Sequence, residues 1–316
     1  MKEFRCDCGQ PLFFDSSVCV ACGRRVAFDP VDMTMRTTDA RICANGRRYG
    51  ACNWLVADGR EYCVACEHNR TVPALDRAAN VRRFIALETA KKRLLYTLRE
   101  LGLPHAGLRF DFLEDGRSDP ERYGDTRVAT GYFDSVITIN VLEADAPIRE
   151  AEREALNEPQ RTLLGHMRHE AGHFFLDRLL VCADWRASFR GLFGDERADY
   201  SQALQSYYAS GPADDWRAGY ISAYASAHPN EDWAETWGHL LHIVDALDTA
   251  YTHGVIATRP AGDDFAAWLA AWRPLSVTLN ELNRSVGLSD AYPFVVNDAV
   301  AQKLRFAWDS VARLRG

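Results

Sequence analysis

The chain has 316 residues, of which 47% are apolar and 26% charged, and this is enough for one large domain and one small one. Its net charge of −7 argues against a nucleic-acid partner, because proteins that bind nucleic acids normally present a basic surface. The N-terminus lacks the apolar core of a signal peptide, and no uncharged apolar run reaches the roughly 18 residues that span a bilayer. We therefore expect a cytoplasmic protein with no membrane partner.

Eight of the nine cysteines lie before residue 67, in two groups of four. In a reducing compartment, such clustering indicates metal binding rather than disulfides. The first set is Cys6, Cys8, Cys19 and Cys22, and the second is Cys43, Cys52, Cys63 and Cys66. Four thiolates satisfy the tetrahedral preference of Zn²⁺ and can fold a segment that is too small to form its own core. The pattern predicts two structural zinc ions, and it leaves an exchange of ligands between the sets open.

Residues 1–72 are therefore expected to form a zinc-ribbon module that braces the fold or contacts a protein partner. This segment holds ten Lys and Arg against nine Asp and Glu. Eight thiolates with two Zn²⁺ ions add four negative charges, so a phosphate-binding surface is not expected here.

Residues 80–102 predict one helix, because the apolar residues repeat with a period of 3.6 and Gly102 follows them. The basic run at residues 91–93 is expected on the solvated face of this helix. Residues 108–113 alternate as a strand does, and residues 128–133 and 135–141 predict a further pair of strands.

Residues 169–173 read His-Glu-Ala-Gly-His, the H-E-x-x-H pattern, within an apolar stretch that predicts a mostly buried helix capped by Asn157. Positions i and i+4 share one helix face, so His169 and His173 can bind one ion. Glu170 lies beside the metal without easily becoming a ligand, which is the place of a base that acts on water. Histidines that are merely hydrogen-bonded in a buried helix are the alternative.

A catalytic zinc also needs a third protein ligand and one open position. Downstream, Asn230 is expected to cap a helix that starts at Glu231, and Glu231 and Glu235 then share one face at i and i+4. This is the Glu-x-x-x-Asp/Glu pattern of gluzincins, in which the first acid binds the metal and the second orients a ligand histidine. An exposed acidic helix face is the alternative, but the flanking residues Trp233 and Trp237 favour burial.

The small sheet that precedes the H-E-x-x-H helix is arranged as in zincins, where an edge strand can pair with an extended peptide. Residues 135–141 are the candidate for this strand. Asp177, one turn beyond His173, is a candidate to support that histidine. His239, one turn after Glu235, is the best candidate among the remaining histidines for a contact with substrate.

The whole chain resembles the bacterial family of zinc-ribbon proteins with a zinc-metallopeptidase domain. The segments that carry the resemblance are Cys22-Gly23, Cys52–Leu55, Ala90–Leu98, Arg161–His173, Phe193–Arg197 and Ser222–Asp245. The catalytic core is also similar to the toxin-type gluzincins, as in anthrax lethal factor, where a tyrosine upstream of the third ligand faces the zinc. Tyr224, seven residues before Glu231, occupies the matching position. The resemblance implies a fold and a reaction class but no substrate.

The sequence thus predicts an α+β protein in which an α-rich, zincin-like metallopeptidase domain with a small β-sheet, residues 73–316, follows the zinc ribbon. Residues 263–286 and 297–311 are expected to add helices to this domain. The predicted function is a zinc-dependent peptidase that acts on peptides or proteins, with one catalytic zinc on His169, His173 and Glu231.

In this hypothesis Glu170 is the general base and acid, and Tyr224 stabilises the oxyanion. Two alternatives remain. One is a non-catalytic interaction protein stabilised by zinc, and the other is a nucleic-acid-associated protease guided by the ribbon, which the charge count does not favour.

Overall fold

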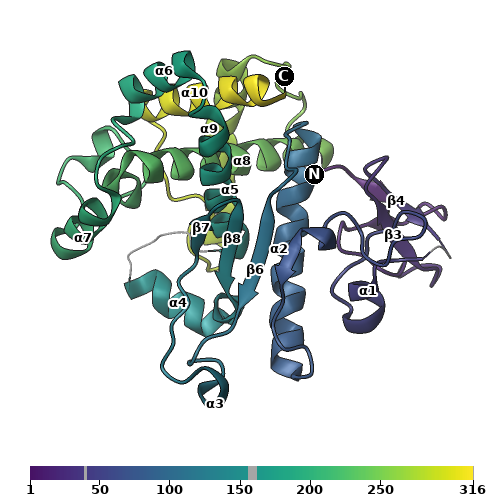
Figure 1. Cartoon of the computed structure of the whole chain (residues 1–316). Coiled ribbons are helices and arrows are strands. Elements are labelled where there is room, and N and C mark those ends of the chain that lie inside the picture. Colours follow the sequence, from purple (N-terminus) through teal and green to yellow (C-terminus); the bar gives the residue numbers. More distant parts are fainter. Residues whose placement is uncertain (39–40, 156–161, 316) are drawn as a thin grey trace. The chain divides into compact units, whose positions relative to one another are not determined.

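The computed structural model describes residues 1–38, 41–155 and 162–315 of the chain (Figure 1). The chain forms two compact units, the first made of Met1–Glu100 and His105–Ala151 and the second of Leu101–Pro104 and Glu152–Gly316. Helices predominate and the sheets are small, so the predicted mixed α and β architecture is confirmed. No helix in the three described ranges is both long and apolar enough to cross a lipid bilayer.

The N-terminal part of the first unit consists of two short antiparallel hairpins, a helix and a 3₁₀ turn. Its elements are β1 (Phe4–Arg5), β2 (Pro11–Leu12), β3 (Val26–Asp29), β4 (Thr34–Thr37), α1 (Ala44–Tyr49) and η1 (Cys66–His68). The rings of Phe14 and Trp54 pack against Phe28, with centroids 5.0 and 4.8 Å apart. Strands as short as these bury little apolar surface, so this part of the unit needs a further source of stability.

A four-stranded sheet and one long helix make up most of the remaining first unit. The elements of this part are β5 (Asn69–Thr71), α2 (Ala78–Glu100), β6 (Arg109–Leu113), α3 (Pro120–Tyr123), β7 (Gly131–Phe133), β8 (Val136–Asn140), η2 (Val141–Ala144) and α4 (Ala146–Ala155). The boundary between the two units falls within α4, after Ala151. The strand order is β5-β6-β8-β7, with β7 antiparallel to β8 and the other pairs parallel. The predicted helix and the three predicted strands are confirmed to within a few residues.

The basic run at the middle of α2 does not form a solvated face, and that prediction is wrong for two of its three residues. Lys91 is fully buried, and its Nζ atom lies 2.6 Å from Glu88 Oε1. Lys92 is also buried and donates a hydrogen bond of 3.2 Å to Asn53 Oδ1 in the ribbon region.

The reason is that α2 is covered on more than one side. Tyr96 packs against Phe14 of the ribbon region with ring centroids 5.2 Å apart, and Phe84 packs against Phe112 of β6 at 6.4 Å. Lysines enclosed in this way need an anionic or amide partner, because an unpaired buried charge is costly.

The strand predicted to accept an extended substrate is not at the edge of its sheet. β8 lies between β6 and β7, and it pairs with β6 from Val136 to Asn140. β7 pairs with its other side from Val136 to Thr138, so most of the strand has neighbours on both sides and the prediction that residues 135–141 form the substrate strand is wrong. The turn from β7 to β8 has positive φ at Asp134 and Ser135, as a tight type I′ hairpin requires, and this hairpin places β7 outside β8.

The second unit is helical. Its described elements are α5 (Leu163–Leu179), α6 (Ala183–Phe193), α7 (Tyr200–Ser210), η3 (Trp216–Ala218), η4 (Tyr224–Ala227), α8 (Pro229–Thr252), α9 (Phe265–Ser285) and α10 (Asp298–Arg315). Helix α8 contacts α5, α6, α9 and α10, so it is the centre of this unit. The helices predicted near residues 263–286 and 297–311 are confirmed as α9 and α10.

The starts of the two helices that carry the predicted site differ from the sequence prediction. Asn157, the predicted cap of α5, lies outside the described residues. The helix begins at Leu163, and the Thr162 side chain caps it by accepting a hydrogen bond from the Gly165 N–H at 2.9 Å. Helix α8 begins two residues earlier than predicted.

His228 caps α8 instead of Asn230. Its Nδ1 atom accepts a hydrogen bond from the Asn230 N–H at 3.1 Å, and Pro229 occupies the first helical position. Proline is favoured at that position because its missing N–H would have no partner inside the helix.

Candidate metal centres and active site

The two sets of four cysteines predicted from the sequence are both assembled. Within each set, the sulfur atoms all lie within 4.8 Å of one another. The Cys6–Cys22 and Cys8–Cys19 sulfur distances are both 3.7 Å, and the Cys52–Cys63 distance is 3.6 Å. A zinc–sulfur bond of about 2.3 Å places the corners of a tetrahedron about 3.8 Å apart, so the spacing fits one zinc ion per set. The geometry matches the assignment within each set and needs no exchange of ligands between sets.

The two cysteine sets differ in their surroundings. In the first set Cys8 and Cys22 are exposed, whereas all four cysteines of the second set are buried. Hydrogen bonds from the backbone and side chain of Arg24 lower the pKa of Cys22 to about 6, which favours the thiolate that a metal binds. In the second set, Cys66 Sγ lies 3.2 Å from Glu88 Oε2, beside the buried ion pair of α2.

Small residues bring α5 and α8 close together in the second unit. A Cβ atom on Gly172 would lie 2.8 Å from the Cα atom of Ala234, so only glycine fits without movement of the backbone. The indole N–H of Trp233 donates a hydrogen bond of 2.8 Å to the Gly172 carbonyl and locks the crossing. This close approach lets side chains from one turn of each helix meet.

The three predicted zinc ligands meet at that crossing. One atom each of His169, His173 and Glu231 lies within 4.8 Å of the other two. Glu231 Oε2 is 3.0 Å from His169 Nε2, and Glu231 Oε1 is 3.5 Å from His173 Nε2. Two imidazole nitrogens and one carboxylate oxygen form a donor set typical of catalytic zinc sites. The side chains present therefore fit a zinc ion.

Glu235 lies behind this group, as the i, i+4 spacing predicts. His169 Nδ1 donates a hydrogen bond of 2.7 Å to Glu235 Oε1, and the Ser222 hydroxyl donates one of 2.6 Å to Glu235 Oε2. With Nδ1 bonded to Glu235, the Nε2 atom of His169 is the nitrogen that faces Glu231 and is placed to bind a metal ion. The contribution of Ser222 has no signal in the sequence, since it lies 13 residues from Glu235 on a separate turn.

Glu170 is buried beside the two histidines. Burial raises the pKa of its carboxyl group, although the charges of His169 and His173 oppose this shift. A carboxylate with a raised pKa is better able to accept a proton near neutral pH than an exposed one.

Two tyrosines lie close to the candidate site. Tyr224, predicted from the resemblance, lies in η4 with its ring centroid 6.0 Å from that of His169. Tyr200 was not predicted, yet its hydroxyl donates a hydrogen bond of 2.7 Å to Glu231 Oε1. The only signal for Tyr200 is its place just after the Phe193–Arg197 segment, which carries part of the family resemblance.

The last two predicted site residues are not among the three side chains that meet at the crossing. Asp177 is an exposed residue of α5, and its support for His173 stays a prediction. His239 is buried in α8, where its Nδ1 atom lies 3.0 Å from the Tyr292 hydroxyl and its ring packs against Phe294. This setting favours a packing role over the predicted contact with substrate, which also stays a prediction.

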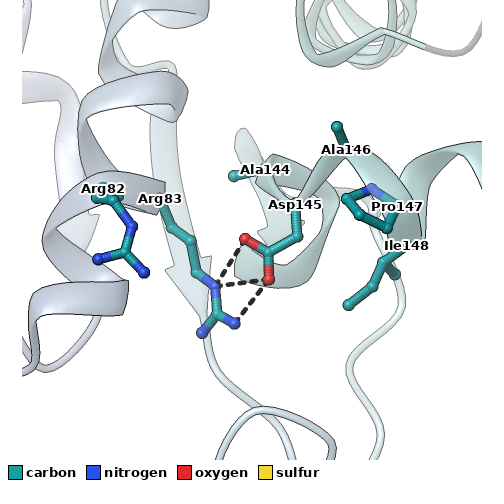
Figure 2. Close-up of a pocket in the computed structure, with 7 residues that line it drawn as sticks. All are labelled: Arg82, Arg83, Ala144, Asp145, Ala146, Pro147 and Ile148. Carbon is teal, nitrogen blue, oxygen red and sulfur yellow. Dashed lines mark hydrogen bonds and ion pairs between the residues drawn. The ribbon is translucent and has the colours of Figure 1, made fainter.

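The pocket drawn in Figure 2 belongs to the first unit and contains none of the predicted site residues. It has a volume of about 460 Å³ and lies between α2 and the start of α4. Arg83 spans it with hydrogen bonds of 2.7 to 3.2 Å to the Asp145 carboxylate. The guanidinium and the carboxylate neutralise each other, so the pocket has no unbalanced charge from this pair.

Comparisons with known proteins agree with this arrangement. Residues 80–310 match the family described as "Putative zinc-binding metallo-peptidase", and residues 3–77 match a zinc-ribbon domain. Uncharacterized proteins of Mycobacterium bovis and Mycobacterium tuberculosis are each 40% identical to the chain, over 97% of its length and 94% of theirs. No solved structure matches the chain. Since the first match covers well over half of the residues, the chain belongs to the zinc-binding metallo-peptidase family and carries a zinc-ribbon domain at its N-terminal end.

Proposed function

We propose that the chain is a zinc-dependent peptidase of the gluzincin type that hydrolyses peptide bonds in peptides or proteins. The observation that carries this proposal is the convergence of His169, His173 and Glu231, with Glu170 buried beside them. Three ligands rather than four are typical of catalytic zinc sites, in which one position takes water or substrate. A zinc ion held there would activate a water molecule and polarise the scissile carbonyl group.

Three side chains of the protein would then transfer protons, orient a ligand and stabilise the oxyanion. The Glu170 carboxylate accepts a proton from the attacking water and later delivers it to the leaving amine. Glu235 holds the His169 ring through its Nδ1–H, so that Nε2 stays directed at the metal position. Tyr224 is proposed to donate its phenol O–H to the carbonyl oxygen as negative charge develops there.

The ribbon is proposed to be a separate structural module with two zinc ions, ending near residue 72. The match to a zinc-ribbon domain over residues 3–77 supports this division, as does the match to the peptidase family from residue 80. Thiolates that hold zinc persist best in a reducing compartment, so the cytoplasm remains the proposed location. A protein partner at the ribbon remains a proposal as well.

The test of the peptidase proposal is Glu170→Gln, which keeps the shape of the side chain and removes its ability to take a proton. We expect cleavage of a peptide library, followed by mass spectrometry, to fall by about 10²- to 10⁴-fold. Zinc content should stay at three ions per chain. Glu121→Gln, at an exposed position in α3, is the matched control and should cleave as the wild type does.

Two outcomes would contradict the proposal. One is a wild-type protein that holds three zinc ions and releases no product from the library, which would favour a non-catalytic interaction protein. The other is a Glu170→Gln variant that cleaves as fast as the wild type, which would remove Glu170 from the reaction.

A further inference from the structure

We propose that residues 194–200 form a clamp on the first turn of α8, and that Tyr200 acts through this clamp as a positioning residue for Glu231. The inference rests on the proposed function, because it concerns the third ligand of the proposed zinc. It assigns a role to the Phe193–Arg197 segment, which neither the ligand set nor the proposed reaction uses. The clamp touches the start of α8 at three successive places.

The first contact is between Gly194 and Pro229. Gly194 has a φ of +101°, which side-chain-bearing residues rarely adopt, and a Cβ atom there would lie 3.2 Å from Pro229 Cγ. Glycine at this position therefore lets the chain leave α6 and run close to the first residue of α8.

The second contact is between Ala198 and His228. Because His228 Nδ1 accepts the hydrogen bond that caps α8, its proton lies on Nε2. Nε2 donates to the Ala198 carbonyl at 3.1 Å, so one imidazole both caps α8 and holds the clamp. The ring of Tyr200 packs against the same imidazole, with centroids 5.2 Å apart.

The third contact is the hydrogen bond of 2.7 Å from the Tyr200 hydroxyl to Glu231 Oε1. The Glu231 side chain is 1% exposed, so water has little access to satisfy its second oxygen. Tyr200 holds Oε1, which lies 3.5 Å from His173 Nε2, while Oε2 lies 3.0 Å from His169 Nε2. A carboxylate held in this way keeps a fixed orientation toward the two histidines and does not have to be ordered when the metal binds.

The charged side chains of the clamp form ion pairs. Glu196 pairs with Arg190 of α6 at 2.5 to 2.8 Å, and Arg197 pairs with Asp195 inside the clamp at 2.7 to 2.9 Å. Asp199 then caps α7 by accepting a hydrogen bond from the Gln202 N–H at 2.9 Å. These bonds shape the segment so that Tyr200 becomes the first residue of α7. Its phenol is directed inward, although the residue as a whole is 41% exposed.

Tyr200→Phe removes the donor and keeps the ring, so it tests the clamp directly. We expect the active-site zinc to bind about 10- to 100-fold more weakly, as is usual when a partner of a metal ligand is lost. The measurement is a competition titration with a fluorescent zinc chelator. A second measurement is the visible absorption of protein that holds two zinc ions and one cobalt ion, and this spectrum should change in Tyr200→Phe.

Two further variants sharpen the test. Tyr208→Phe changes a tyrosine of the same helix that is 61% exposed, and it should leave both the zinc affinity and the cobalt spectrum as in the wild type. His228→Asn keeps a side chain that can cap α8 but is too short to reach Ala198, and we expect a smaller loss of zinc affinity than in Tyr200→Phe.

Wild-type zinc affinity together with a wild-type cobalt spectrum in Tyr200→Phe would overturn the clamp. If the protein still cleaves peptides with three zinc ions, that result leaves the proposed peptidase intact. A wild-type protein that binds only two zinc ions would contradict the proposed peptidase, and the positioning role would fall with it.

Discussion

The two cysteine sets take their metal ligands from short stretches of sequence, whereas the His–Glu group (His169, His173 and Glu231) takes them from two helices that are distant in the sequence. Each cysteine set draws its four ligands from a stretch of about 25 residues or fewer, in a region of short strands. The His–Glu group joins His169 to Glu231, which are 62 residues apart on two long, buried helices. Four thiolates complete the tetrahedron of a zinc ion, whereas three ligands leave a position for chemistry. We therefore expect metal binding to stabilise the fold of the ribbon, whereas in the helical unit the packing of two helices brings the ligand group together.

Removal of zinc should therefore unfold the ribbon and spare α5 and α8, and this is the largest effect we expect. Zinc binding to small cysteine-rich modules is worth about 10–16 kcal/mol, and that energy is also folding energy. After strong chelation, hydrogen exchange should lose protection across β3 and β4 and keep it in α8. Protected ribbon amides in zinc-free protein would show that the aromatic core of this region folds without metal.

Replacing a single cysteine should destabilise the ribbon more when that cysteine is buried than when it is exposed. Cys63→Ser removes a buried ligand, and we expect it to lose one zinc ion and most of the exchange protection of the ribbon. Cys22→Ser removes an exposed ligand and should be milder, because water can take the open position. Cys182→Ser, outside both sets, is the control and should keep full zinc content.

In the helical unit, the two acids of α8 should separate into ligand and support. Glu231→Ala is expected to lose the third zinc ion and peptidase activity while α8 stays folded. Glu235→Ala should weaken zinc binding by about 10- to 100-fold, because it frees the His169 ring rather than removing a ligand. Zinc content after dialysis, with the ribbon zinc as an internal reference, checks both. The opposite pattern would mean that the two roles are reversed.

Tyr224→Phe tests whether the ring beside His169 takes part in the reaction. An oxyanion donor is worth about 2.7–4 kcal/mol, so kcat should fall by about 10²- to 10³-fold while KM and zinc content stay near wild type. Tyr220→Phe is the matched control, because the Tyr220 ring packs against Lys303 Nζ at 4.2 Å. A loss of kcat in Tyr220→Phe with none in Tyr224→Phe would assign the oxyanion contact to Tyr220 instead.

The smallest predicted effect concerns the packing of the crossing helices. Gly172→Ala places a methyl group 2.8 Å from the backbone of Ala234, and overpacking of this kind costs about 1–3 kcal/mol of unfolding free energy. Gly191→Ala is the control, since its added methyl group meets nothing within 4 Å and alanine is the better helix former. Denaturant titration should show a loss in the first variant and a small gain in the second. Equal stability of the two variants would mean that α5 and α8 can move apart at little cost in free energy.

Local patterns in the sequence were enough to predict the elements and most of the ligand group. The cysteine spacing, the H-E-x-x-H motif and the i, i+4 pair of acids each lie within one segment, where helix and turn geometry decide which side chains share a face. The meeting of His169 with Glu231 also needs the crossing of α5 and α8. The period of residues 80–102 predicted α2 for the same reason, and the family resemblance is confirmed over most of the chain. The catalytic roles remain proposals.

Only the tertiary structure decided how these segments cover one another. Lys91 and Lys92 read as a solvated run, but the sheet and the ribbon region enclose α2 and bury both. The 135–141 stretch reads as an edge strand, yet the tight turn at Asp134 puts β7 outside β8. The bond from Tyr200 to Glu231 spans 31 residues and depends on how a loop lies against the start of α8. Such contacts follow from packing between distant segments, and no periodicity within one segment encodes them.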